Sequence, residues 1–152
     1  MSYVPFYPRA ERQQILQPAT PVKNMQASND ILIVDDEAPI AQLLADVLQD
    51  EGYSIRIARD GASALLEIMK RPPGLVLLDV AMPVMLGSDL LVYLRRHGFG
   101  DLPIIIMTAG LSPLVYLAQG ATEVLPKPFD VDVVMETVAH YLPRGPERAG
   151  AE

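Results

Sequence analysis

Short apolar runs alternate with amphipathic stretches between residues 31 and 142, and this alternation restricts the possible folds more than any other feature. The apolar runs predict five strands, at residues 31–34, 53–58, 75–78, 104–107 and 123–125. The third and fourth runs are apolar throughout, which is typical of parallel strands buried on both faces. The pattern therefore predicts an α/β domain in which helices cover both faces of a parallel sheet.

Capping and helix-breaking residues predict a helix after each strand. The first helix runs from about Ala38 to Gly52, Asp60 caps the second, Ser88 the third, and Asp130 caps a last helix over 131–142. A fourth helix, between residues 112 and 119, contains Pro113 early and should be short or displaced. Five strand–helix units with right-handed crossovers predict a flavodoxin-like doubly wound five-stranded parallel sheet, order 2-1-3-4-5.

Both ends of the chain lack this periodicity. Residues 1–29 are rich in proline and are expected to form a flexible N-terminal arm, whose aromatic residues, Tyr3, Phe6 and Tyr7, could contact a partner or the domain. Residues 143–152 are expected to form a flexible C-terminal tail. A chain of 152 residues then holds one domain, at residues 30–142.

Composition excludes several classes of function. A net charge of -7 argues against direct nucleic-acid binding, and the absence of cysteine excludes disulfides and thiolate chemistry. No apolar run approaches the roughly 20 residues that a membrane span needs, and the N-terminal segment does not resemble a secretion signal. We therefore expect a cytoplasmic protein without membrane insertion.

Charged and hydroxyl side chains follow the strands. Asp35 and Asp36 follow the first strand, Asp79 the third, Thr108 the fourth and Lys127 the fifth. Because the carboxyl ends of parallel strands meet at one edge of a sheet, these groups should converge there. Carboxylates so close together repel one another unless a cation lies between them, and oxygen ligands of this kind suit Mg²⁺.

The same group of residues suits phosphoryl transfer. A carboxylate such as Asp79 can attack phosphorus when nearby cations, here Mg²⁺ and Lys127, neutralise the charge of the phosphoryl group. The hydroxyl group of Thr108 can donate a hydrogen bond to a phosphoryl oxygen.

Four stretches make the chain similar to the receiver domains of response regulators, the chemotaxis-regulator-like switches of two-component signalling: ILIVDDE at 31–37, LVLLDVAMPVMLG at 75–87, IIIMTA at 104–109 and LPKPF at 125–129. The resemblance implies that Asp79 is the phosphoacceptor and that Thr108 and Lys127 contact the phosphoryl group. It also implies a cis peptide bond before Pro128.

The resemblance further implies a set of Mg²⁺ ligands. Asp36, Asp79 and the backbone carbonyl of Ala81 would bind the ion directly, and Asp35 would bind it through water. The partners implied are a histidine kinase or phosphotransfer protein as donor, an unidentified downstream protein, and a second copy of the chain in a homodimer. Such a protein is a phospho-accepting regulator and not an enzyme, although it can catalyse its own phosphorylation and dephosphorylation.

Two features depart from the family. Val124 occupies the position at which these domains usually carry an aromatic switch residue, and valine has no ring to rotate. Compared with the receiver domains that the chain resembles, the segment between Thr108 and Lys127 is also about three residues shorter than usual. Both features predict an altered partner surface near the fourth helix.

Two other functions remain open. A degenerate receiver would act only as a phosphorylation-independent binding module. A phosphohydrolase of the haloacid dehalogenase type would also use an aspartate after a strand, but that chemistry needs a second acid two residues later, where this chain has Ala81.

Overall fold

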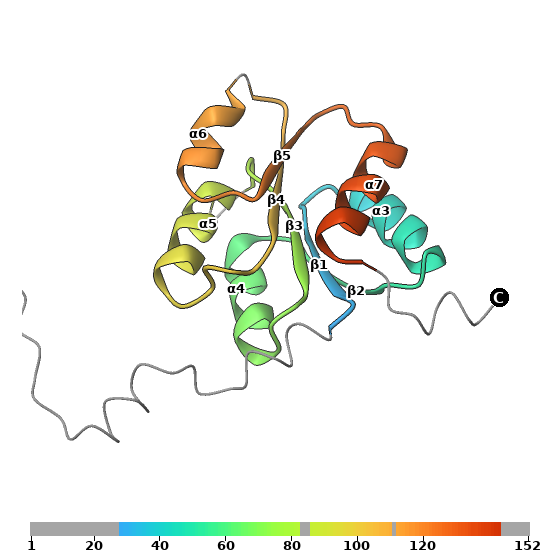
Figure 1. Ribbon diagram of the computed structural model, residues 1–152, viewed down its shortest axis with the longest axis horizontal. Coiled ribbons are helices and arrows are strands. Elements are labelled where there is room, and N and C mark those ends of the chain that lie inside the picture. Colours follow the sequence, from blue (N-terminus) through green and yellow to red (C-terminus); the bar gives the residue numbers. More distant parts are fainter. Residues whose placement is uncertain (1–27, 83–85, 111, 144–152) are drawn as a thin grey trace, which may run out of the picture.

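A computed structural model describes residues 28–82, 86–110 and 112–143 of the chain. Five parallel strands form one sheet in the order β2-β1-β3-β4-β5, which confirms the predicted topology (Figure 1). The strands are β1 (Asp30–Val34), β2 (Ser54–Ala58), β3 (Leu75–Asp79), β4 (Ile104–Thr108) and β5 (Glu123–Pro126).

Helices cover both faces of the sheet. They are α3 (Ala38–Asp50), α4 (Gly61–Lys70), α5 (Gly87–Arg96), α6 (Pro113–Ala118) and α7 (Val131–Tyr141). Helices α3 and α7 lie on one face, and α4, α5 and α6 lie on the other (Figure 1). The three central strands, β1, β3 and β4, therefore bury side chains in both directions.

The central strands meet this demand with apolar residues at all positions except one end of each strand, where Asp30 begins β1, Asp79 ends β3 and Thr108 ends β4. In β1, Ile31 and Ile33 join the core beneath α3 and α7, whereas Leu32 and Val34 join the core beneath α4 and α5. All four side chains are fully buried. Alternating directions along a strand explain why the sequence shows an unbroken apolar run instead of a polar and apolar alternation.

Two of the three predicted helix caps are confirmed. The side chain of Asp60 accepts a hydrogen bond from the Ser63 N–H (2.7 Å), and that of Asp130 accepts one from the Asp132 N–H (2.8 Å). The prediction that Ser88 caps α5 is wrong, because α5 begins at Gly87 and its N-cap, Leu86, makes no side-chain cap. Ser88 already lies inside the first turn.

Helix α6 is short, as predicted. It has six residues, of which none is buried, and Leu114, Val115 and Leu117 are exposed. Pro113 occupies its first turn, where a missing N–H costs no intrahelical hydrogen bond. Only the ring of Tyr116 packs in part against the core beneath α4 and α5.

Most of the expected arm (1–29) and tail (143–152) lies outside the described residues, so both remain predictions. Within the described residues, Asn29 leads directly into β1 and Leu142 follows α7. The helices described there are all too short or too polar to cross a membrane.

Candidate functional site

The carboxyl ends of β1 and β3 bring three aspartates together. The two strands are neighbours in the sheet, so Asp35, just after β1, lies beside Asp79, the last residue of β3. Carboxylate oxygens of Asp35, Asp36 and Asp79 all lie within 4.8 Å of one another. Asp35 and Asp79 are buried, with 0% and 2% of their surface exposed, whereas Asp36 is exposed to solvent.

The ammonium group of Lys127 faces this cluster from the end of β5. Its Nζ atom lies 3.4 Å from Oδ1 of Asp79, 3.5 Å from Oδ2 of Asp35 and 3.7 Å from Oε1 of Glu37. The Lys127–Pro128 peptide bond is cis, as expected. One positive charge thus pairs with three carboxylates, and Asp36 adds a fourth carboxylate to the cluster, so negative charge exceeds positive charge at the site.

Backbone donors hold two of the carboxylates in place. The Glu37 N–H donates to Oδ1 of Asp35 (2.9 Å), and the Ala81 N–H donates to Oδ1 of Asp79 (3.2 Å). Oδ2 of Asp35 is buried and accepts no hydrogen bond from any described residue, although Lys127 attracts it. A buried oxygen of this kind, beside two more carboxylates, fits a site for a hard divalent cation.

Burial dominates the ionisation of Asp79. It raises the pKa of this carboxyl, against the opposing effects of the Ala81 N–H and the Lys127 charge. For Lys127, burial lowers the pKa, but the attraction of Asp35, Asp79 and Glu37 outweighs burial and raises it. Lys127 is therefore a stable cation at neutral pH.

Thr108 adjoins the cluster at the end of β4. Its side chain is buried, and its Oγ1 accepts a hydrogen bond from the Gly110 N–H (2.8 Å). Its carbonyl oxygen accepts a hydrogen bond from the Lys127 N–H (2.7 Å), which fixes the two residues relative to each other. The Thr108 hydroxyl retains its own proton for donation to a ligand.

A family model described as the response regulator receiver domain matches residues 31–139, which is most of the chain. The chain belongs to the response regulator receiver domain family.

Receiver domains of known regulators are similar to this one over most of its length. Response regulator MprA of Mycobacterium sp. (strain KMS) is 38% identical over 75% of this chain and 50% of its own. The nitrogen assimilation regulatory protein NtrX of Azorhizobium caulinodans is 37% identical over 69% of this chain and 24% of its own. The chain thus spans half or less of the length of these curated relatives.

Solved receiver structures have the same fold. Chemotaxis protein CheY4 of Vibrio cholerae, 34% identical, superposes with a TM-score of 0.70 and covers 76% of this chain and 100% of its own. The receiver domain of NtrX from Brucella abortus, 32% identical, gives the same TM-score and the same two coverages. Receiver domains of this family support phosphorylation-dependent signalling and are not classical enzymes.

This receiver domain brings together the side chains predicted from its sequence. Asp35, Asp36, Asp79 and Lys127 converge, and Thr108 adjoins them. For Ala81, the described contact is its N–H on Asp79, so the role of its carbonyl group stays a prediction.

Sequence reasoning assigned no role to two residues beside this cluster. Glu37 pairs with Lys127, a role that its place directly after Asp35 and Asp36 could have suggested. Tyr116 is the second: a Cβ atom built on Gly110 would lie 3.8 Å from its hydroxyl and 3.0 Å from Oγ1 of Thr108. No local sequence pattern predicts that Tyr116 lies so near Gly110, because the position depends on how α6 packs on the sheet.

Proposed function

We propose that this receiver domain is a phosphorylation-dependent switch in which Asp79 accepts a phosphoryl group from a histidine kinase or a phosphotransfer protein. One observation carries the proposal: the carboxylates of Asp35, Asp36 and Asp79 lie together, and the Lys127 ammonium group lies beside the buried carboxylate of Asp79. We assign residues 30–142 to the switch itself, with the flanking arm and tail outside it.

The transfer uses a side-chain oxygen of Asp79 as nucleophile. An O–P bond forms on the carboxylate while the P–N bond of the donor phosphohistidine breaks, and the imidazole leaves with the electron pair and takes a proton from solvent. Lys127 neutralises one phosphoryl oxygen, since its ammonium group already lies 3.4 Å from Oδ1 of Asp79. The Thr108 hydroxyl donates to another phosphoryl oxygen.

Mg²⁺ would be held by Asp36, Asp79 and the carbonyl of Ala81, with Asp35 bound through water. The ion supplies the positive charge that permits an anionic nucleophile to approach an anionic phosphoryl group. The chain's own residues orient that nucleophile, because the Ala81 N–H fixes one oxygen of Asp79 and leaves the other to react.

Acetyl phosphate, a small-molecule donor, tests the proposal. Incubation with Mg²⁺ should add one phosphoryl group to the chain, detected by intact mass, and none to Asp79→Asn. Asp50→Asn, an exposed aspartate at the end of α3, is the matched control and should be phosphorylated normally. Equal phosphorylation of the Asp79→Asn variant would refute the assignment.

The two rival functions give different results in the same experiment. A phosphohydrolase would turn over phosphate esters continuously, but the residue two positions after Asp79 is Ala81, which cannot act as an acid or a base. A binding module would form no adduct under any condition. The complete set of charged groups at the site favours the switch over both.

The surface that reads out phosphorylation should differ from that of other receivers. Val124, in β5, is partly buried and packs against the core beneath α4 and α5, and α6 is a single short helix. We propose an altered partner surface around α6, used by a downstream protein or by a second copy of the chain. Amide chemical shifts with and without beryllofluoride test this. The resemblance makes the face of α6, β5 and α7 the usual output surface of these domains, and large shifts confined to that face would count against the proposal.

A further inference from the structure

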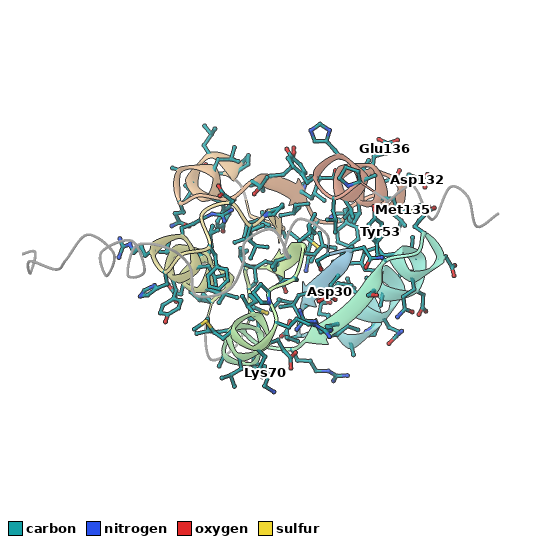
Figure 2. All side chains as sticks on the ribbon, turned by 60° about the horizontal axis from the view of Figure 1, so that its bottom comes forward. Asp30, Tyr53, Lys70, Asp132, Met135 and Glu136 are labelled. Carbon is teal, nitrogen blue, oxygen red and sulfur yellow. The ribbon has the colours of Figure 1, made fainter. Side chains whose placement is uncertain are left out.

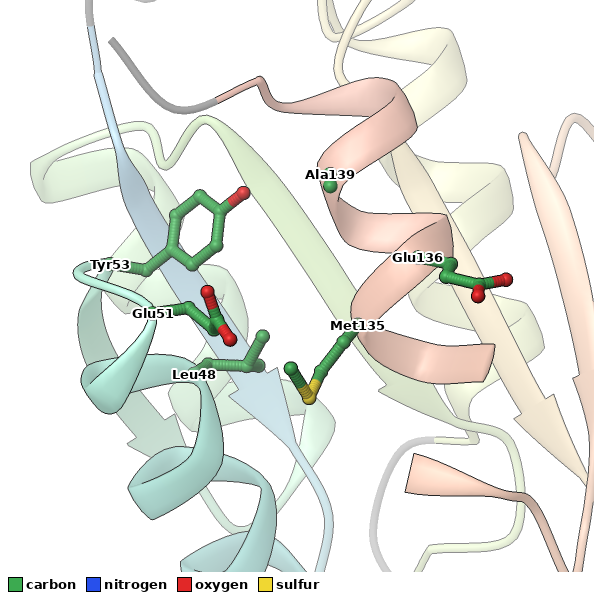
Figure 3. Close-up of a pocket in the computed structure, with 6 residues that line it drawn as sticks. All are labelled: Leu48, Glu51, Tyr53, Met135, Glu136 and Ala139. Atoms are coloured by element: carbon green, nitrogen blue, oxygen red, sulfur yellow. The ribbon is translucent and has the colours of Figure 1, made fainter. Parts of the chain in front are cut away.

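An open groove lies between α3 and α7, on the face of the sheet opposite to α4, α5 and α6. Its volume is about 200 Å³, and its walls are Leu48, Tyr53, Met135, Ala139 and the acidic residues Glu51 and Glu136. Leu48 and Met135 point toward each other across it (Figure 3). Small-molecule sites usually measure about 300–1,000 Å³, so this groove suits a single large side chain better than a ligand.

The two helices that form the groove carry only negative formal charges. Helix α3 contains Asp46 and Asp50, α7 contains Asp132 and Glu136, and neither helix has a lysine or an arginine. Asp132, Met135 and Glu136 all lie on α7, with Asp132 one turn before Glu136 (Figure 2). Of the two acidic residues, Glu136 lines the groove. The surface around the groove therefore attracts a segment that combines apolar with basic residues.

The N-terminal arm enters the domain beside this groove. The side chain of Asn29 donates to the carbonyl oxygen of Gly52 (3.2 Å), and its carbonyl oxygen accepts from the Ser54 N–H (3.2 Å). Gly52 and Ser54 are the chain neighbours of Tyr53, which lines the groove. Residues 1–27 thus connect to the domain at the end of the groove.

We propose that the aromatic segment of the chain's own N-terminal arm, Tyr3 to Tyr7, docks in the groove between α3 and α7. This segment offers three aromatic rings, followed closely by Arg9 and Arg12. Residues 1–27 hold three basic residues and one acidic residue, whereas the chain as a whole has a net charge of -7. The aromatic rings of this segment match the apolar walls of the groove, and its arginines match the acidic surface around the groove.

The length of the arm permits this contact within one molecule. The 21 residues between Phe6 and Ser28 can span up to about 70 Å when extended, whereas α7, with 11 residues, is only about 16 Å long. A tether of this length can raise the effective concentration of the segment to the order of millimolar. The contact can therefore form within one molecule even if the groove binds the same segment only weakly as a free peptide.

Other occupants fit less well. The C-terminal tail also leaves the domain near Tyr53, whose hydroxyl donates to the Leu142 carbonyl (2.7 Å), but residues 144–152 contain no apolar side chain larger than proline. A second copy of the domain on this face would place α3 and α7 against α3 and α7. That arrangement brings like charges together.

Paramagnetic labelling of the full chain tests the contact. The protein has no cysteine, so Ser2→Cys provides a single site for a nitroxide label. We expect the label to broaden the amide signals of Leu48, Met135 and Ala139 more strongly than those of Leu66 and Met69 on α4, which lies across the sheet (Figure 1). Equal broadening of both layers would refute the proposal.

Three further variants test what holds the arm in the groove. Replacing Tyr3, Phe6 and Tyr7 together by alanine should abolish the selective broadening. The matched control replaces three polar residues of the same arm, Gln13, Gln14 and Gln17, and should keep it. Ala139→Lys, at an exposed position of α7, should block the groove and give the same loss as the aromatic variant.

A mixed sample distinguishes an arm from the same molecule from an arm of a second copy. It contains nitroxide-labelled protein without ¹⁵N and ¹⁵N-enriched protein without a nitroxide. Broadening of the ¹⁵N protein in this mixture would mean that the arm comes from a second copy, which contradicts the intramolecular contact. None of these measurements requires Mg²⁺ or phosphorylation, so they stand or fall independently of the role proposed for Asp79.

Discussion

Gly87 lies directly against the backbone carbonyl of Asp79, with no room between the two residues for a side chain. A Cβ atom at Gly87 would collide with the Asp79 carbonyl oxygen and lie 2.8 Å from the α-carbon of Val80. The Gly87 N–H also donates to the Val80 carbonyl oxygen (3.2 Å). The start of α5 is therefore packed onto the end of the strand that carries the candidate phosphoacceptor.

Gly87→Ala should destabilise the domain because backbone atoms, unlike flexible side-chain ends, cannot move aside cheaply. We expect the free energy of unfolding to fall by about 1–3 kcal/mol, as for other overpacked sites, measured by urea denaturation. Gly100→Ala is the control, since a Cβ there meets nothing within 4 Å. It should change stability by less than about 0.5 kcal/mol. Equal stability of the two variants would contradict this account.

The sheet could be predicted from sequence because each of its physical requirements leaves a local trace. A strand buried on both faces needs consecutive apolar residues, as in Ile104–Met107. Two of the helices, α4 and α7, begin at a side-chain cap, Asp60 and Asp130, and a capping residue is visible in the sequence. The site residues could be predicted for the same reason, because each follows a strand directly and the topology brings the strand ends together.

Features that depend on contacts between distant segments could not be predicted in this way. Ser88 looked like a cap, but the packing of Gly87 onto Asp79 decides where α5 begins. The nearness of Tyr116 to Gly110 depends on how α6 lies on the sheet. Neither relationship has a fixed spacing or a residue pattern that would reveal it.

Mg²⁺ should stabilise the domain through the carboxylate cluster. At a concentration 100 times its dissociation constant, the ion should raise the free energy of unfolding by about 2.7 kcal/mol, seen as a higher Tm. Asp36→Asn should remove this gain without harming the metal-free protein, because Asp36 is exposed. Asp50→Asn, also exposed but outside the cluster, should respond to Mg²⁺ like the unmodified protein; an unchanged response of Asp36→Asn would exclude that residue as a ligand.

Asp79 should make the metal-free domain less stable as the pH rises. Burial raises the pKa of this carboxyl above its ordinary value of 3.8, so the folded state binds the proton more tightly than the unfolded state does. Stability therefore falls between 3.8 and the raised pKa, and the loss persists at neutral pH. Asn has the same shape but no charge to bury.

Asp79→Asn should consequently be more stable than the unmodified protein at neutral pH in the presence of a chelator. The difference should vanish well below pH 3.8, where the Asp79 carboxyl is protonated in the folded and in the unfolded protein. Urea denaturation across this pH range measures the effect. A less stable Asn variant at neutral pH would show that attraction to Lys127 outweighs the burial of the charge.

Arg95, near the end of α5, bridges the loop that precedes β4 and the loop that precedes β5. Its guanidinium group donates to four acceptors: the carbonyl oxygens of Phe99 (2.5 Å), Leu102 (2.7 Å) and Gly120 (2.7 Å), and Oγ1 of Thr122 (3.2 Å). Lysine has one nitrogen and cannot reach all four. Arg95→Lys should lower the free energy of unfolding by about 2 kcal/mol, whereas Arg96→Lys, at an exposed position, should have almost no effect; similar losses in both would contradict a bridging role.

Helix α6 should open more readily than the rest of the domain. A six-residue helix without a buried residue has little besides the partly buried Tyr116 ring to hold it, so its amide hydrogens should exchange faster than those of β4. Tyr116→Ala should speed this exchange further while lowering global stability by only about 1 kcal/mol. Leu114→Ala is the control, because that side chain is 73% exposed and should leave the exchange rates unchanged. If the α6 amides exchanged as slowly as those of β4, α6 would be part of the rigid core, and the altered partner surface proposed above would have to be rigid as well.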